Sequence, residues 1–505
     1  MKICLHIKSF LLFCISLLLT NVVSKIVPTE CSNFARKIYK PSKVVQLNFF
    51  PHPLHNKINS EKNVSEKLWK SSNLTKRNNC NLGKKQTYSN LDKGINNGRN
   101  LHTKGNVLCN KKMKLIIQLL NKAKLYDFKF FSPAKINLFL RLKEKKETYN
   151  EISTLMHSIN LGDDLFITVL SREDQKRLKH VLYPCTSGDF LTIRKNKDYD
   201  REHNDKKSCQ TYEKKDIHYY NNYPLNEDNI IIKVLKRYRE ELGINDDIRF
   251  LVHINKRIPI FSGVGGGSSN GASVFYFLEK YFYKYLKSNE LKHEFLKKIG
   301  SDISFFTSSG FAYCTEKGNY VIDLGNAQAT ISEKRIYLFQ VNEGLSSKSV
   351  YENVNYDKIV QYNPVTLLTN FITNSDSNKI AKIVEEKEKN FLNRFVHVDK
   401  MDMQNIFLND LEHSAFLLVR KLKDLKYFLI SQNIFNVVTM SGSGSSLFAI
   451  TKNDMNLNSE KWYVKDLIKH VREKLNVKIK VYLCDFLRKR EHFWYKPTKI
   501  AEVIT

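Results

Sequence analysis

The sequence predicts an α+β protein of two lobes with a cleft between them. In the middle of the chain, a strand-like stretch (248–254) leads through a glycine-rich loop into an amphipathic helical stretch (268–286). Nearer the C-terminus, a helical stretch (409–431) precedes two strand-like stretches joined by a glycine turn. A polar segment (374–403) separates the two halves. Each half therefore mixes helix and strand periods, and ligand sites are common between two such lobes.

The length and the charge set broad limits on the class of protein. The 505 residues, of which 42% are hydrophobic, leave room for two or three globular domains. The net charge is +31, but residues 1–112 hold 20 Lys and Arg against 4 Asp and Glu, which is +16 of that total. Because so much of the excess lies in this leader, the charge does not indicate a nucleic-acid partner. Nine cysteines without a CxxC pair fit neither a zinc site nor a disulfide scaffold.

The leader is predicted to be a targeting sequence in two parts. Residues 1–24 read as a signal peptide, since the apolar run from Phe10 to Leu19 is shorter than the about 20 residues of a membrane-spanning helix. Residues 25–112 are rich in Lys, Asn and Ser, which is transit-peptide composition. This order resembles the bipartite leader of apicoplast-type plastids. We therefore expect a protein of the plastid stroma that reaches it by the secretory route, with no membrane association after leader removal. The alternative is a disordered basic tail on a secreted protein.

Ordered structure is expected to begin near residue 125. Alternating apolar residues predict strands over 128–142 and 164–170, and residues 229–242 predict a helix that ends at Gly243. The chain then divides as follows: a first lobe at 125–330 with a surface insertion at 171–226, a second lobe at 331–490 with an insertion at 374–403, and a C-terminal tail at 491–505.

The stretch from Pro259 to Asn270 carries the clearest chemical signal. Glycines before a helix let backbone N–H groups approach an anion, and the helix start adds donors and partial positive charge. Phosphate is the natural ligand. The loop lacks the Lys-Ser/Thr ending of a P-loop and the G-x-G-x-x-G spacing of dinucleotide-binding folds. On the glycines alone, a flexible turn remains an alternative.

Three stretches in order resemble the signatures of the GHMP kinases, the family that includes homoserine, mevalonate and galactose kinases. They are Ser132-Pro-Ala-Lys-Ile-Asn-Leu-Phe-Leu140, Val264-Gly-Gly-Gly-Ser-Ser-Asn270 and Met440-Ser-Gly-Ser-Gly-Ser-Ser446. Shorter matches support them at Tyr149–Leu155, Gly162–Leu165, Asn229–Ile231, Gly300–Asp302 and Asn409–Glu412. The resemblance covers residues 128–490. It implies a two-lobed fold with a left-handed βαβ unit in the N-terminal lobe, against the usual right-handed rule, and a ferredoxin-like C-terminal lobe.

The resemblance also implies two catalytic residues. Asp302 would accept the proton of the attacking substrate hydroxyl, and Lys135 would keep that carboxylate ionised and stabilise charge on the reacting oxygens. Positioning and charge neutralisation supply most of the acceleration in phosphoryl transfer. The alternatives are that Asp302 only caps the helix that follows it, and that Lys135 is a solvated strand lysine.

ATP and Mg²⁺ are the expected cofactors, with the Mg²⁺ ligand not readable from the sequence. The third signature, Ser441–Ser446, is expected to close the cleft, with a plain glycine hairpin as the alternative. The ATP phosphates are expected to lie against the second signature, at Pro259, Gly263, Val264, Gly265, Gly266, Gly267, Ser268, Ser269 and Asn270.

The substrate implied by the resemblance is the small molecule 4-diphosphocytidyl-2-C-methyl-D-erythritol, phosphorylated on its C-2 hydroxyl in the non-mevalonate route to isoprenoid precursors. Tyr149 and Tyr351 would sandwich the base, beside Asn150, where the family usually has His. The other substrate-binding residues expected are Asn137 toward the polyol, Lys256 and Ser443. Two alternatives stay open: another GHMP kinase that uses homoserine, mevalonate or a sugar, and a non-catalytic basic nucleic-acid-binding protein on the same fold.

Overall fold

The computed structural model describes residues 126–179, 185, 188–195 and 223–504, the last range with gaps at 245–246, 284–285, 287, 326, 328, 361, 393–402, 453–455 and 491–492. All of them belong to one of the two compact units of the chain, Gly94–Thr505. The predicted signal and transit peptides lie outside the described residues. Among the described residues, no helix is both long and apolar enough to cross a membrane.

The first sheet is built around a long antiparallel hairpin. Strand β1 (Phe128–Lys145) pairs with β2 (Asn150–Leu170) along its whole length, from Phe128 opposite Ile167 to Lys145 opposite Asn150. The sheet order is β3-β4-β2-β5-β6, with β3 (Phe190–Lys195) parallel to β4 (Arg249–Lys256) and the rest antiparallel. Its remaining elements are β5 (Phe311–Glu316), β6 (Tyr320–Asp323), α5 (Arg172–Lys179), α7 (Ile230–Leu242), α8 (Gly266–Tyr281), α9 (Asn289–Lys297) and α10 (Ile303–Thr307).

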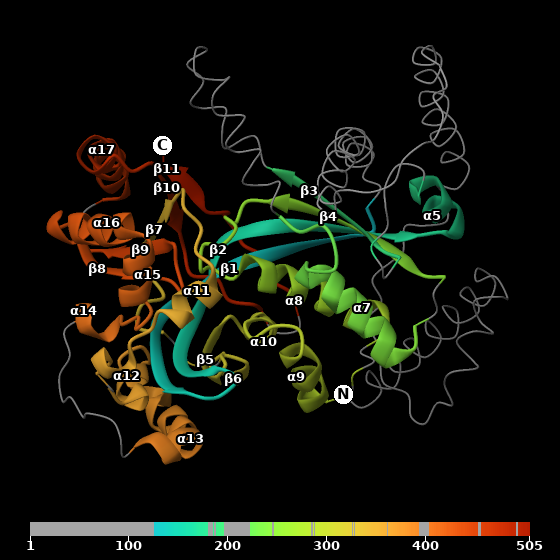
Figure 1. Cartoon of the computed structure of the whole chain (residues 1–505), viewed down its shortest axis with the longest axis horizontal. Coiled ribbons are helices and arrows are strands. Elements are labelled where there is room, and N and C mark those ends of the chain that lie inside the picture. The colour runs from blue at the N-terminus through green and yellow to red at the C-terminus, as the bar shows by residue number, and fades with distance from the viewer. Residues whose placement is uncertain are drawn as a thin grey trace, which may run out of the picture. The chain divides into compact units, whose positions relative to one another are not determined.

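Helices α7 to α10 lie together on one side of the hairpin (Figure 1), where their apolar faces form one core with β2 and β4. Helix α7 has the two ends that the sequence predicts. The Asn229 side chain accepts a hydrogen bond from the Ile231 N–H, and Gly243 ends the helix in the left-handed conformation at φ 60°. The unit β3–α7–β4 is the parallel βαβ crossover of this lobe. The left-handedness of this crossover stays a prediction.

The second sheet has the order β11-β10-β7-β9-β8, and its pairs are all antiparallel. Its strands are β7 (Ile336–Val341), β8 (Phe435–Met440), β9 (Ser446–Thr451), β10 (Ile479–Cys484) and β11 (Glu502–Ile504). The elements α11 (Ser347–Glu352), η3 (Tyr356–Lys358), α12 (Pro364–Thr369), α13 (Asn374–Leu392) and α14 (Met403–Ile406) follow β7, then α15 (Glu412–Leu418) and α16 (Arg420–Ser431), while α17 (Leu457–Leu475) follows β9. Numbered along the chain, β7, β8, β9 and β10 lie in the spatial order 4-1-3-2 with helices after the first and third, which is the ferredoxin-like arrangement. Two sheets with their own helices confirm the two-lobed α+β prediction.

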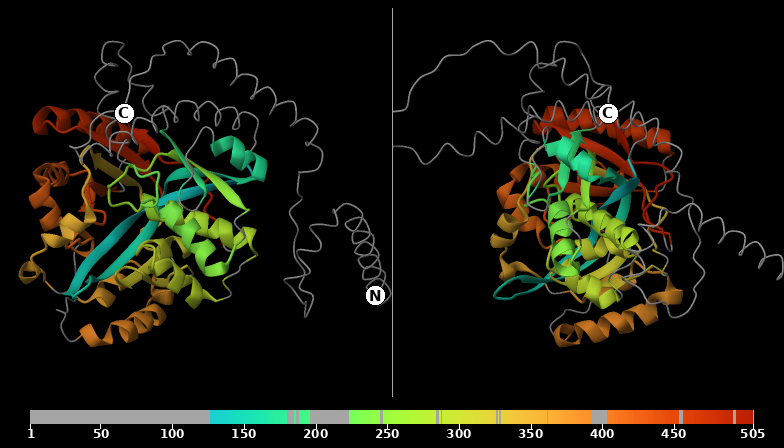
Figure 2. Two further views of the ribbon diagram at one scale, coloured as in Figure 1. Left: turned by 45° about the vertical axis from the view of Figure 1, so that its right-hand side comes forward. Right: turned by 90° about the vertical axis from the view of Figure 1, so that its right-hand side faces the viewer.

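The segment predicted as the second polar insertion is largely the helix α13. Ile380, Val384 and Glu388 share one face of it, and Glu388 is fully buried. Its carboxylate accepts hydrogen bonds from Lys143 Nζ at 2.7 Å and from the Tyr313 hydroxyl at 2.6 Å. The closed end of the β1–β2 hairpin therefore lies beside α13 (Figures 1 and 2). The helix was not predicted from the sequence because a charged residue, Glu388, occupies its buried face; that the segment is an insertion stays a prediction.

One other boundary needs correction. The segment 491–505 is not a separate tail, because β11 pairs with β10 and the buried Trp494 donates from Nε1 to the Phe131 carbonyl at 3.0 Å. The segment 171–226 is predicted as a surface insertion around weaker strand fragments; within it, α5 follows β2 directly and the strand β3 joins the first sheet. Both segments are short or polar, so their packing is fixed by distant partners rather than by local periodicity.

Candidate active site

Backbone hydrogen bonds join the three signature stretches at one place. The Lys135 N–H on β1 donates to the Val264 carbonyl at 3.0 Å, and the Ser446 N–H donates to the Ser262 carbonyl at 3.1 Å. The Ser441 hydroxyl donates to the Gly263 carbonyl, also at 3.1 Å. The strand, the glycine loop and the third turn thus form one continuous junction.

Gly263 is the residue that permits this junction. Its φ is +74°, and a Cβ atom there would lie 2.2 Å from the Ser441 carbonyl oxygen and 2.8 Å from the Gly444 nitrogen. Such contacts are possible only for glycine. The 441–446 turn therefore packs directly on the glycine loop as part of this junction.

Lys135, Asn137 and Asp302 form the polar centre of the junction. Lys135 is 3% exposed, and its Nζ donates to Asn137 Oδ1 at 2.5 Å and lies 3.5 Å from Asp302 Oδ2. Asn137 is held in turn, because its Nδ2 donates to Thr154 Oγ1 at 2.8 Å. The ammonium therefore faces a carboxylate that is itself still 30% exposed and open to a ligand.

The alternatives for these two residues do not fit the geometry. Asp302 directly precedes α10, but its side chain makes no capping hydrogen bond; it accepts one from the Ser301 hydroxyl at 3.2 Å. Lys135 is buried and not a solvated strand lysine. Lys135, on β1, and Asp302, directly before α10, point toward each other, as the proposed pairing requires.

The start of α8 lies directly against this centre. Gly265 precedes the helix at φ +73°, and a Cβ atom there would lie 3.0 Å from Lys135 Cγ; one on Gly266 would lie 3.0 Å from Lys256 Nζ. The first N–H groups of a helix have no partner within it, and they gather partial positive charge. With two lysines beside them, they suit the phosphates of a nucleotide.

The nine residues expected at ATP divide into two groups. Gly263 and Gly265 to Ser268 are partly exposed, whereas Val264, Ser269, Asn270 and Pro259 are buried and shape the loop from behind. Among the described residues, the buried Ser269 hydroxyl has no hydrogen-bond partner. The accessible surface at the helix start is therefore formed by the first group, and the second group supports it.

Lys256 lies on the phosphate side of the site. Its Nζ pairs with Asp163 Oδ2 at 2.6 Å, and both side chains are buried. The other oxygen of Asp163 accepts the N–H groups of Arg257 and Ile258, each at 2.8 Å. The pair therefore supports the entry to the glycine loop, and this arrangement does not bring Lys256 to the residues expected at the base.

A hollow of about 290 Å³ lies at the other end of the site, lined by Lys145, Asn150, Lys348, Tyr351 and Glu352. Burial and the charge of Asp302 raise the pKa of the Tyr351 phenol, so this ring lies within electrostatic reach of the catalytic candidate. Tyr149 is not among the lining residues; the Lys317 ammonium lies 4.7 Å from the centre of its ring. The structure thus brings Asn150 and Tyr351 together and leaves Tyr149 beside them.

Comparison with known proteins decides the family. The model of the GHMP kinases N terminal domain matches residues 229–311, which hold the glycine loop and Asp302. The chain is 31% identical over 336 residues to the chloroplastic 4-diphosphocytidyl-2-C-methyl-D-erythritol kinase of Arabidopsis thaliana, covering 66% of this chain and 70% of that protein. The chain belongs to the 4-diphosphocytidyl-2-C-methyl-D-erythritol kinase family.

Other members of this kinase family extend the match. The chloroplastic protein of Oryza sativa subsp. japonica is 30% identical over 68% of this chain and 69% of its own length. The protein of Protochlamydia amoebophila (strain UWE25) is 27% identical over 69% of this chain and 96% of its own length. A crystal structure of 4-(cytidine 5'-diphospho)-2C-methyl-D-erythritol kinase has a TM-score of 0.43 and 19% identity, covering 71% of this chain and 99% of that one.

Ser443 and Asn409 connect the third turn of this family member to its surroundings. The Ser443 hydroxyl lies 2.7 Å from that of Ser347, at the start of the helix that carries Tyr351. Asn409 Nδ2 donates to the carbonyls of Met440 at 2.7 Å and Gly442 at 2.8 Å. In the sequence, Asn409 is only part of a short match. Its structural role, holding the third turn in place, depends on two acceptors that lie 31 and 33 residues away in the chain.

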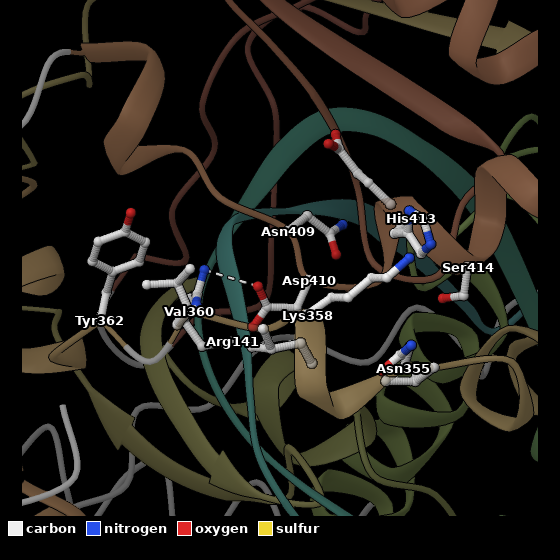
Figure 3. Close-up of a pocket in the computed structure, with 12 residues that line it drawn as sticks. Arg141, Asn355, Lys358, Val360, Tyr362, Asn409, Asp410, His413 and Ser414 are labelled. Atoms are coloured by element: carbon white, nitrogen blue, oxygen red, sulfur yellow. Dashed lines mark hydrogen bonds and ion pairs between the residues drawn. The ribbon is translucent and has the colours of Figure 1, made fainter. Parts of the chain in front are cut away.

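A second hollow, of about 300 Å³, adjoins Asn409 (Figure 3). Arg141 Nη1 pairs there with Asp410 Oδ1 at 2.8 Å, and the Leu142 N–H donates to Asp410 Oδ2 at 2.7 Å. Burial nevertheless raises the pKa of Asp410 to about 6, although both partners favour its charged form.

The raised pKa of Asp410 predicts a specific pH dependence of stability. Between about pH 4 and 6, this carboxyl is protonated in the folded state but ionised in the unfolded state. Its contribution therefore lowers the free energy of unfolding as the pH rises through this range. Asp410→Asn stays neutral throughout. From pH 4 to pH 7, the unfolding free energy of the variant should therefore rise relative to wild type by about 2 to 3 kcal/mol. Urea unfolding at both pH values measures this, and an unchanged difference would contradict it.

Proposed function

We propose that this chain transfers the γ-phosphoryl group of ATP to the C-2 hydroxyl of 4-diphosphocytidyl-2-C-methyl-D-erythritol, a step of the non-mevalonate route to isoprenoid precursors. The observation that carries the proposal is the Lys135–Asp302 pair, 3.5 Å apart, beside the glycine start of α8. Membership of the kinase family supports the same reaction. Asp302 accepts the hydroxyl proton, and Lys135 stabilises negative charge on the reacting oxygens.

ATP binds at the start of α8 in this proposal. The N–H groups of Gly265 to Gly267 and the hydroxyls of Ser268 and Ser269 hold the phosphates, with Lys135 and Lys256 nearby. Mg²⁺ accompanies ATP and neutralises charge on the γ-phosphoryl group; it often binds chiefly through phosphates and water. Asp302 is the carboxylate at the edge of this region.

The cytidine end of the substrate lies in the hollow lined by Asn150 and Tyr351. Tyr351 offers a ring face to the base, with Tyr149 at its edge, while Asn137 hydrogen-bonds the polyol beside Lys135. Ser443 lies between the two ends, next to Ser347. The substrate would thus extend from the β1–β2 hairpin to the glycine loop.

A substrate panel tests this function. The leaderless protein should turn over the diphosphocytidyl substrate with ATP and Mg²⁺, and should show far lower kcat/KM with homoserine, mevalonate and galactose. Turnover of one of these three alone would replace the substrate assignment by another GHMP kinase activity. Tight RNA binding at physiological salt without any phosphoryl transfer would favour the nucleic-acid-binding alternative.

The proposed location is the plastid stroma. Four relatives bear names that include the word chloroplastic, from Arabidopsis thaliana, Oryza sativa subsp. japonica, Solanum lycopersicum and Mentha piperita. Residues 1–112 fused to a fluorescent protein should direct it to the plastid through the secretory route. Secretion of the fusion from the cell would contradict this location.

A further inference from the structure

Glu388 joins α13 to the closed end of the β1–β2 hairpin through a buried carboxylate (Figure 2). One carboxylate oxygen pairs with Lys143 Nζ at 2.7 Å, and the other accepts hydrogen bonds from the hydroxyls of Tyr313 at 2.6 Å and Ser153 at 3.2 Å. The Lys143 ammonium also pairs with Glu151 Oε1 at 3.1 Å. Because the side chains of Lys143 and Glu388 are 2% and 0% exposed, water screens their attraction little.

The helix itself is fixed by contacts that do not use this carboxylate. Lys387 Nζ pairs with Glu316 Oε1, at the end of β5, at 3.2 Å and lies 3.6 Å from the centre of the Tyr320 ring on β6. Val384, one turn before Glu388, is fully buried in a core that it shares with residues of β1 and β2. Helix α13 is therefore a fixed support for the end of the hairpin.

The hairpin residues of this ion-pair network flank two residues that line the hollow of about 290 Å³. Lys143 precedes Lys145 by two positions, and Glu151 directly follows Asn150. Lys145 and Asn150 are paired across the hairpin, and both line the hollow. A wall that is already fixed when a ligand arrives does not have to be ordered by binding, so less of the binding free energy is lost.

We propose that Glu388 is a positioning residue, which fixes the end of the β1–β2 hairpin through Lys143 so that one wall of the hollow is in place before the diphosphocytidyl substrate binds. The inference rests on the proposed function. Without the Glu388–Lys143 pair, the substrate itself must order the hairpin end, and this weakens binding. The bound complex, once formed, keeps the same reacting geometry. ATP binding at the start of α8, a different element, should not change.

Glu388→Gln tests the proposal by comparing the two substrates. The substitution keeps the size of the side chain, and Lys143 keeps Glu151 as a partner, so the buried ammonium is not left unpaired. In the variant, KM for the diphosphocytidyl substrate should rise about 10-fold, while kcat and KM for ATP stay at the wild-type values. The matched control is Glu385→Gln, on the exposed face of α13, which should change none of the three. Thermal unfolding checks that each variant is folded.

Lys143→Met removes the other member of the pair and should raise the same KM, so either folded variant decides the outcome. In a Lys143→Met background, Glu388→Gln should add no further rise, because no ammonium remains for the carboxylate to hold. The proposal is overturned if a folded Glu388→Gln protein keeps the wild-type KM for the diphosphocytidyl substrate, or if KM for ATP rises as much. An equal effect of Glu388→Gln with and without Lys143 would also overturn it. A wild-type protein that does not phosphorylate this substrate would instead overturn the proposed function, and this inference with it.

Discussion

Asp302→Asn should lower kcat with the diphosphocytidyl substrate by about 10³-fold, since a positioned general base contributes roughly 10² to 10⁴ and the amide also loses its charge interaction with Lys135. The substitution is nearly isosteric at a side chain that is 30% exposed and makes no capping hydrogen bond, so the fold should survive. Steady-state kinetics give kcat and KM, and thermal unfolding checks the fold.

The control for Asp302→Asn is Asp424→Asn, on the exposed face of α16, which should leave kcat unchanged. Lys135→Ala should lower kcat comparably to Asp302→Asn, because it removes the other member of the pair. Turnover near the wild-type value in a folded Asp302→Asn protein would show that another group accepts the proton, or that none is needed.

Gly263→Ala should abolish measurable turnover and destabilise the protein by about 3 kcal/mol or more, through both a clash and backbone strain. The added methyl would lie 2.2 Å from the Ser441 backbone oxygen, which cannot move without separating the glycine loop from the third turn. Urea unfolding and the turnover assay measure the two effects.

Gly243→Ala isolates the strain in that experiment. Gly243 also has a positive φ, +60°, but nothing lies within 4 Å of its added Cβ. It should therefore cost only about 1 to 2 kcal/mol and leave kcat intact. If Gly263→Ala behaved like Gly243→Ala, the close contact between the two signature loops would not be needed for activity.

Local signals were enough to predict the elements around the phosphate end. The caps of α7, the strand leading to the glycines and the amphipathic α8 all follow from residues within one or two turns of each other. The family resemblance then identified Lys135 and Asp302 as catalytic candidates, and the structure places Lys135 Nζ 3.5 Å from Asp302 Oδ2. Their roles remain predictions until the variants are measured.

Long-range partners explain what the sequence did not reveal. Strand β2 begins at Asn150, well before the predicted start at residue 164. The earlier part of the strand was missed because buried polar residues such as Ser153, Thr154 and His157 interrupt the alternation of apolar and polar side chains. Two of them are explained by partners elsewhere in the chain: Ser153 donates to the Glu388 carboxylate, and Thr154 accepts from Asn137. The same holds for Glu388 in α13 and for Tyr356, whose partners lie 245 and 206 residues away.

A crystal structure of the complex with the diphosphocytidyl substrate and a non-hydrolysable ATP analogue would test the account most directly. We expect the C-2 hydroxyl oxygen within hydrogen-bond distance of the Asp302 carboxylate, and the γ-phosphate against the N–H groups of Gly265 to Gly267 with Lys135 beside it. A substrate bound with its C-2 hydroxyl away from Asp302, or a nucleotide bound elsewhere than at the start of α8, would contradict it.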